Sequence, residues 1–243
     1  LKSNDYNLVY KKAIEYYNKG DYQRAMNLLD GVRSVFVGQA KAQNIAYYRA
    51  FCSYNMKDYQ IASDLFKQFI QTYPESSFAE ECLYMMGFCD YKASPKPRLD
   101  QQVTEKAIRE FQLYLSRYPY SMRKDKVNTY MDEMRDKLSY KAYLSAKNYY
   151  LREHYKAAVI SLQNCLKDYP GSKYREEIMY MLFVSKYQMA VNSVEDKKVE
   201  RYNNAREEYY YFADEYPNSR YAADVKKMYE DIEAYLENYK FED

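Results

Sequence analysis

Residues 62–76 read ASDLFKQFIQTYPES and hold the pattern that decides the fold. An alanine is followed four positions later by a large apolar residue, three positions after that by another, and then by Tyr-Pro-x-Ser. The pattern returns in 107–121, 158–172 and 205–219, each time with proline twelve positions after alanine. Steps of four and three follow one face of an α-helix. Proline ends a helix because it lacks an N–H and clashes with the preceding turn.

The alanine of each copy is small enough for a neighbouring helix to come close, and A-x3-F…P is typical of the second helix of a tetratricopeptide hairpin. The first helices align in the same register, since Ala13, Ala50 and Gly87 stand 37 residues apart. We therefore predict an all-α chain that forms a tetratricopeptide-type helical-hairpin solenoid. About five repeats are expected, with a capping helix from Ala222 to about Tyr239. Solenoids of this kind usually act as binding surfaces.

A stretch without Gly or Pro, from Ser121 to about Glu153, predicts one long helix. We expect an N-terminal module over 1–120 with repeats one to three, a linking helix over 121–153, and a C-terminal module over 137–243 with repeats four, five and the cap. Repeats three and five carry insertions near 94–97 and 194–198, which are expected to be surface loops. Such loops can mark a contact surface or be tolerated decoration.

Composition and motifs argue against several functional classes. The balance of 37 basic and 35 acidic residues gives no basis for broad nucleic-acid binding. We predict no metal site, no cofactor and no enzymatic activity, because His154 is alone and neither a C-x-x-C pair nor a catalytic motif occurs. Acidic pairs such as Glu80-Glu81, Glu176-Glu177 and Glu207-Glu208 are expected on solvated, salt-bridging faces. The four cysteines are expected to be buried thiols, although a disulfide between the equivalent positions Cys52 and Cys89 stays open.

Tyrosine is the compositional anomaly, with 34 copies beside 10 Phe and no Trp. On the first helices, tyrosines recur three residues before and four residues after the small residue, and asparagines recur beside them. A ladder of this kind could hold an extended peptide by stacking and by hydrogen bonds, or its rings could simply fill gaps between successive helices. The peptide-binding candidates are Asn7, Tyr10, Tyr17, Asn18, Asn44, Tyr47, Tyr54, Asn55, Tyr84 and Tyr91; repeat four extends both columns with Tyr143 and Tyr150.

The four Tyr-Pro-x-Ser copies, the long helix, and the segment from Lys137-Leu138-Ser139-Tyr140 to Tyr155-Lys156-Ala157-Ala158-Val159 together resemble the BamD family. These are the tetratricopeptide lipoproteins of the outer-membrane β-barrel assembly machine. The resemblance covers nearly the whole chain. It implies a periplasmic location on the outer membrane, through a lipidated cysteine and an export signal expected upstream of Leu1.

The resemblance also implies partners. The N-terminal repeats would receive unfolded β-barrel precursors, whose C-terminal segments are apolar and aromatic. The C-terminal repeats would dock on periplasmic domains of the barrel-forming subunit, with accessory lipoproteins as further partners. Lys173 and Arg175 lie where the family uses a basic residue for docking. Two alternatives stay open: another periplasmic adaptor in envelope or peptidoglycan maintenance, and a cytoplasmic chaperone adaptor, although that class commonly uses a basic carboxylate clamp.

Overall fold

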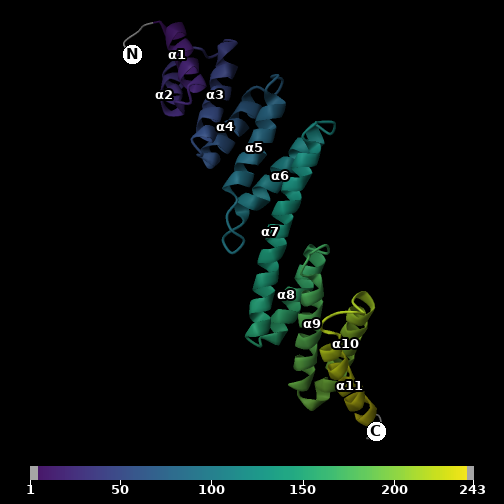
Figure 1. The fold of residues 1–243 in the computed structure, drawn as a ribbon. Helices are drawn as coiled ribbons and strands as arrows, with labels where there is room; N and C mark the ends of the chain where they lie inside the picture. Colours follow the sequence, from purple (N-terminus) through teal and green to yellow (C-terminus); the bar gives the residue numbers. More distant parts are fainter. Residues whose placement is uncertain (1–4, 240–243) are drawn as a thin grey trace. The chain divides into compact units, whose positions relative to one another are not determined.

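The computed structural model describes residues 5–239 of the 243-residue chain, and all regular structure in that range is α-helical (Figure 1). The predicted ranges 1–120 and 137–243 each include four terminal residues outside the described part. Successive helices pair as hairpins, which confirms the all-α, tetratricopeptide-type prediction. The described helices are α1 Tyr6–Asn18, α2 Tyr22–Val32, α3 Lys41–Asn55, α4 Tyr59–Thr72, α5 Ala79–Ala93, α6 Gln102–Arg117, α7 Lys124–Leu151, α8 Tyr155–Asp168, α9 Arg175–Val191, α10 Glu195–Glu215 and α11 Ala222–Tyr239.

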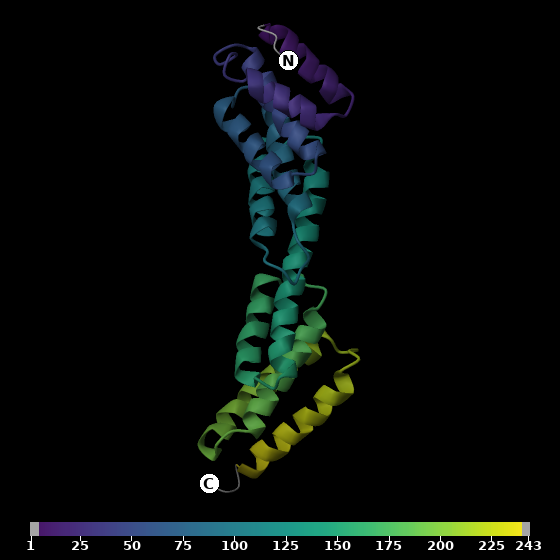
Figure 2. The ribbon, with the colours of Figure 1, turned by 90° about the vertical axis from the view of Figure 1, so that its left-hand side faces the viewer.

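The chain divides into two compact units, 1–134 and 135–243. Unit 1 holds α1 to α6 and the first part of α7, and unit 2 holds the rest of α7 and α8 to α11. Within unit 2, α11 packs on α9 and α10, as the side view in Figure 2 shows. Its buried face consists of Val225, Ile232 and Leu236, so α11 closes the core of repeat five.

The Tyr-Pro-x-Ser turns adopt the same backbone four times. Each tyrosine leaves the helical region, with φ between −132° and −127°, because the residue before proline is excluded from it. Each serine hydroxyl then accepts the backbone N–H two residues later, at 3.0–3.2 Å. The motif therefore ends one helix and holds the turn that leads into the next.

The turns inside repeats one, two and four use a different device. Gly20, Lys57 and Glu153 each take a left-handed conformation, with φ of 80°, 67° and 59°. In all three turns the following N–H bonds a carbonyl five residues back, at 2.9–3.0 Å. Only glycine adopts this conformation without steric cost, so the lysine and the glutamate are held there by the turn bonds.

The small positions of the first helices are where helices meet most closely. Ala13, Ala50 and Ala146 are fully buried. At the equivalent Gly87, an added Cβ would lie 2.9 Å from Cδ1 and 3.0 Å from Cε1 of Phe111. Phe111 is itself fully buried, so α5 needs glycine at this point to pack on α6.

A buried ionic cluster joins α4, α5 and α6. Lys106 Nζ lies 2.8 Å from Asp90 Oδ2 and 3.7 Å from Glu110 Oε1, and Ser63 donates to Asp90 at 3.0 Å. Glu110 Oε2 is buried without a hydrogen-bond partner among the described residues. Burial, and then the hydrogen bond with Asp90, raise the pKa of Glu110 to about 8.

One expectation changes and two are met. The charged segment near 194–198 is not a loop, since α10 begins at Glu195 and the extra residues lengthen the helix. The insertion near 94–97 is a loop, and Gln101 holds it by donating to the carbonyls of Lys96 and Leu99. All four cysteines are buried free thiols, and this includes the pair for which a disulfide stayed open.

We predict that Gly87→Ala lowers the free energy of unfolding by about 1–3 kcal/mol, because the new methyl group overpacks the Phe111 ring. Urea denaturation measures this change. Gly31→Ala is the matched control, since nothing lies within 4 Å of the place where its Cβ would stand. It should leave stability unchanged or raise it by up to about 1 kcal/mol. Equal effects of both substitutions would contradict the close contact.

We predict that Glu110 makes stability fall as the pH rises. A raised folded-state pKa means that the folded chain holds the proton more tightly than the unfolded chain, so this contribution is complete below the ordinary pKa of 4.5 and is lost through about 8. Between pH about 6 and about 9, wild type should lose on the order of 1–2 kcal/mol more than Glu110→Gln. Urea midpoints across that range test it, and parallel curves for the two proteins would refute it.

Candidate functional site

The first tyrosine column lies on α1, α3 and α5 and is partly engaged in packing. Tyr10 is half-buried, with its ring 6.2 Å from Phe36. Tyr47 is half-buried and lies 4.5 Å from the rings of both Phe51 and Phe78. Tyr84 is only 7% exposed and belongs to the buried core of unit 1.

The second column is half-buried throughout and continues onto α7. Tyr17 packs edge-on against Tyr48 at 4.9 Å, and Tyr54 lies 6.2 Å from Phe88. Tyr91 stacks on Tyr130 at 4.4 Å. Ring contacts through Tyr48, Phe51, Phe88 and Tyr130 link the tyrosines of the two columns, except Tyr10, into one cluster of unit 1, and we call this cluster the aromatic strip.

The asparagines beside the columns differ in their surroundings. Asn7 is exposed and accepts a hydrogen bond from Lys41 Nζ at 2.6 Å. Burial raises the pKa of Tyr10, and the neighbouring Asn44 side chain partly offsets this rise. Asn55 donates to the carbonyl of Phe51 at 2.8 Å, and Asn18 is exposed. Of the four, Asn18 and Asn7 offer the most accessible amide groups.

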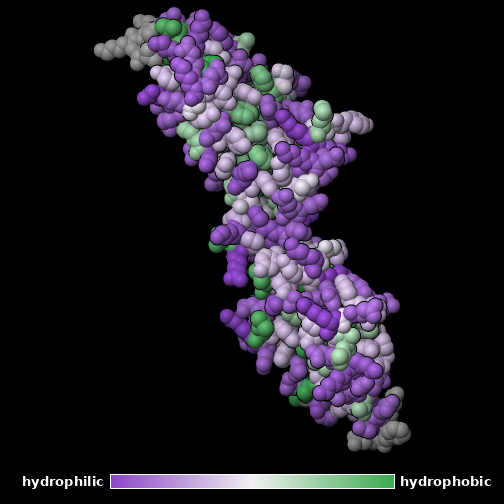
Figure 3. Space-filling model, in the orientation of Figure 1, coloured by the Kyte–Doolittle hydropathy of each residue, from purple (hydrophilic) through white to green (hydrophobic). Residues whose placement is uncertain are grey.

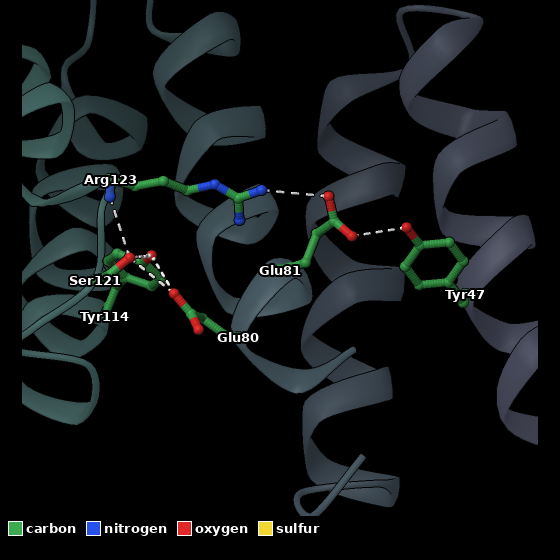
Figure 4. A network of polar contacts seen from close by, with 6 residues as sticks. All are labelled: Tyr47, Glu80, Glu81, Tyr114, Ser121 and Arg123. Atoms are coloured by element: carbon green, nitrogen blue, oxygen red, sulfur yellow. Dashed lines mark hydrogen bonds and ion pairs between the residues drawn. The ribbon is translucent and has the colours of Figure 1, made fainter. Parts of the chain in front are cut away.

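A polar network crosses the aromatic strip between α3, α5 and the start of α7 (Figure 4). The Tyr47 hydroxyl donates to Glu81 Oε2 at 2.8 Å, and the other oxygen of Glu81 lies 3.5 Å from Arg123 Nη2. Burial, and then the hydrogen bond to Glu81, raise the pKa of Tyr47. The Arg123 guanidinium also lies 4.7 Å from the Tyr84 ring centre, so it sits over an aromatic face as well as beside a carboxylate.

The neighbouring carboxylate, Glu80, ties the end of α6 to α5. Its Oε1 accepts from Ser121 Oγ at 2.8 Å and from the Tyr114 hydroxyl at 3.0 Å. Ser121 is the motif serine, so one residue both accepts a backbone N–H within the turn before α7 and anchors that turn to the preceding first helix, α5. In unit 2 the motif serine Ser219 donates to Glu176 at 2.6 Å in the same way.

Sequence reasoning missed the acidic pairs. Glu80, Glu81, Glu176 and Glu177 are half-buried acceptors between repeats, and Glu208 is buried beside Lys186 at 2.6 Å. Glu207 is exposed as expected, and Glu81 and Glu177 do form ion pairs. The available signal was a register of 96 residues, in which Glu80 and Glu81 recur as Glu176 and Glu177. Arg123, Phe88 and Tyr130 were also missed, because they lie outside the tyrosine columns.

Unit 2 repeats the tyrosine positions of unit 1 at a spacing of 96 residues, but one apolar position becomes basic. Tyr47 and Tyr54 recur as Tyr143 and Tyr150, but Lys147 stands where unit 1 has Phe51. Lys147 Nζ donates to Tyr143 and to Glu177, each at 2.8 Å. Burial opposes ionisation of Glu177, but hydrogen bonds from Lys147 and Tyr143 outweigh it and lower its pKa.

The two predicted docking residues of unit 2 have different roles. Arg175 makes a bidentate pair with Glu215, at 2.5 and 2.9 Å, and is largely occupied within the unit. Lys173 is exposed, with Asp136 at 3.6 Å. Lys173 is therefore the more accessible cation of the pair.

Other kinds of site are not found in the described part of the chain. Residues 5–239 contain no group of three or more metal-binding side chains. None of the helices described is both long and apolar enough to cross a membrane.

A model of the YfiO family, described as outer membrane lipoprotein, matches residues 2–177 and 141–242. The chain belongs to this family. YfiO is the BamD family, so the resemblance noted in the sequence is confirmed. No curated protein matches the sequence.

Three solved structures show remote similarity to this chain. The TPR2AB domain of yeast Sti1, in complex with pHSP90, is 14% identical with a TM-score of 0.42, over 94% of this chain and 98% of that one. A TPR repeats protein from Bacteroides fragilis NCTC 9343 is 13% identical with a TM-score of 0.45, over 96% and 99%. The human IFIT1 dimer with PPP-AAAA is 16% identical with a TM-score of 0.33, over 95% and 56%. These similarities are too low to bear on function.

We predict that Tyr47 and Glu81 are energetically coupled. In a double-mutant cycle with Tyr47→Phe and Glu81→Gln, the coupling energy should be about 0.5–1.5 kcal/mol, because each single change leaves the other half-buried group with a lost hydrogen bond. Urea denaturation of the four proteins measures it. Additive losses would show that the two side chains are satisfied by water instead.

Proposed function

We propose that this protein is a non-catalytic binding scaffold of the outer membrane that helps to recognise β-barrel proteins and insert them into the membrane. Membership of the YfiO family carries this proposal. The half-exposed aromatic strip of unit 1 supports it, because it offers a surface suited to apolar, aromatic segments of unfolded precursors.

The chemistry of the strip suits an extended chain. Tyr47, Tyr54 and Tyr91 present half-buried rings, and their neighbours fix the ring positions before any ligand arrives. Apolar side chains of a ligand would pack on these rings, while Asn7, Asn18 and Arg123 would serve its backbone and carboxylate groups.

Unit 2 is proposed to dock on periplasmic domains of the barrel-forming subunit, with accessory lipoproteins as further partners. The exposed Lys173 is the leading contact, and Arg175 would act mainly by holding the start of α9 against Glu215. A lipid anchor upstream of Leu1 is proposed to hold the protein on the periplasmic face of the outer membrane, as the family description supports.

Peptide binding tests the proposal. A dye-labelled peptide of alternating apolar and polar residues that ends in Phe should bind wild type, and Tyr47→Ala with Tyr54→Ala should weaken binding about tenfold, since two stacking rings are lost. Fluorescence anisotropy measures the affinity, and thermal melting of the same samples measures stability.

The matched control is Tyr143→Ala with Tyr150→Ala, at the equivalent positions of unit 2. It should lower the melting temperature by a similar amount and leave peptide affinity unchanged. Unchanged affinity in the unit 1 variant, together with a large loss of stability, would mean that the strip serves only packing.

A further inference from the structure

The turn between α6 and α7 differs from the other three Tyr-Pro-x-Ser turns at two positions. The residue before the motif serine and the residue after it are Glu75 and Ser77, Gly171 and Lys173, and Asn218 and Arg220 in the other turns. Here they are Tyr120, 98% exposed, and Met122, 102% exposed. Only this turn places two large apolar side chains fully in solvent.

The fold does not require these two residues. The backbone bonds of the turn, from Ser121 N–H to Tyr118 and from Lys124 N–H to Ser121, recur in the other turns with polar residues at both places. Full exposure means that nothing within the unit covers either side chain. At the place of this turn, Figure 3 shows pale and green atoms that protrude from a mainly hydrophilic surface.

The surroundings of the turn are basic. Residues 117–126 contain four basic side chains and one acidic one. Arg117 and Arg123 are held within the unit by the Pro74 carbonyl and by Glu81. Lys124 and Lys126 are exposed at the start of α7. An exposed aromatic and apolar tip flanked by cations is the composition of a segment that lies in an anionic membrane interface.

We propose that the α6–α7 tip inserts Tyr120 and Met122 into the surface of an anionic phospholipid membrane. The tyrosine ring would sit at the level of the headgroups, its neighbour Met122 would reach the acyl boundary, and the exposed lysines would face the phosphates. Charge complementarity favours this surface over a neutral one, and an outer membrane lipoprotein works beside a membrane. The inference is independent of peptide binding by the aromatic strip.

A single tryptophan tests insertion directly, because the chain has none. In Tyr120→Trp, emission should shift to shorter wavelength with vesicles of equal parts phosphatidylglycerol and phosphatidylethanolamine, and should be quenched by brominated acyl chains. Vesicles of phosphatidylcholine alone should cause a much smaller shift. Emission that responds to no vesicle overturns the proposal, and so does emission that shifts only when a folded partner protein is added.

Co-sedimentation with the same anionic vesicles tests the tip without a probe. Tyr120→Glu with Met122→Ser reproduces the repeat-two turn, which the chain already folds, and should bind about tenfold more weakly than wild type. Asn218→Glu adds the same charge in the equivalent turn of repeat five and should bind like wild type. Equal binding by all three proteins overturns the proposal, as does an equal loss in both variants.

Discussion

The proline of the Tyr-Pro-x-Ser motif is the constraint on which the rest of the structure depends. It forbids the preceding tyrosine from staying helical, and the serine side-chain oxygen then accepts a backbone N–H within the turn that leads to the next helix. Because Tyr, Pro and Ser make the same bonds in four turns, every second helix from α4 onward connects to the next first helix in one geometry. A solenoid has contacts only between neighbours, so this repeated geometry is what allows successive interfaces to use the same positions.

Polar groups at those interfaces are placed by that geometry. Glu81 meets a tyrosine of the repeat before it, and Glu80 meets the motif serine that follows its own hairpin. A half-buried carboxylate is costly unless its hydrogen bonds are made, so each of these links favours one stacking register over a slipped one. In unit 2 the same position, Glu177, accepts a hydrogen bond from Lys147, which stands where unit 1 has Phe51. The register is kept although this neighbouring residue has changed from a ring to a cation.

The sequence was sufficient for the helices and insufficient for the contacts between them. Periodicity, proline and small residues are local signals, so the hairpins, the long α7 and the cap could all be predicted. The burial of Tyr84 and the pairing of Glu81 with Tyr47 and Arg123 could not be predicted. They depend on how far one helix pair is rotated relative to the next. The charged residues at 194–198 were misjudged for a related reason: a run of charges suits a loop or an exposed helical turn equally well, and no Gly or Pro lies within the run to decide between them.

The aromatic strip shows how packing and binding can share the same side chains. The hydroxyl of a tyrosine between helices needs a hydrogen-bond partner. Here the hydroxyls of Tyr47 and Tyr91 donate to the carboxylates of Glu81 and Glu133. Those bonds fix the rings while leaving them half exposed. A ligand that packs on them would therefore order few side chains, and the entropy cost of binding would be small. The same bonds explain why phenylalanine would not be equivalent at these positions: it would keep the apolar area but lose the tether that holds the ring in place.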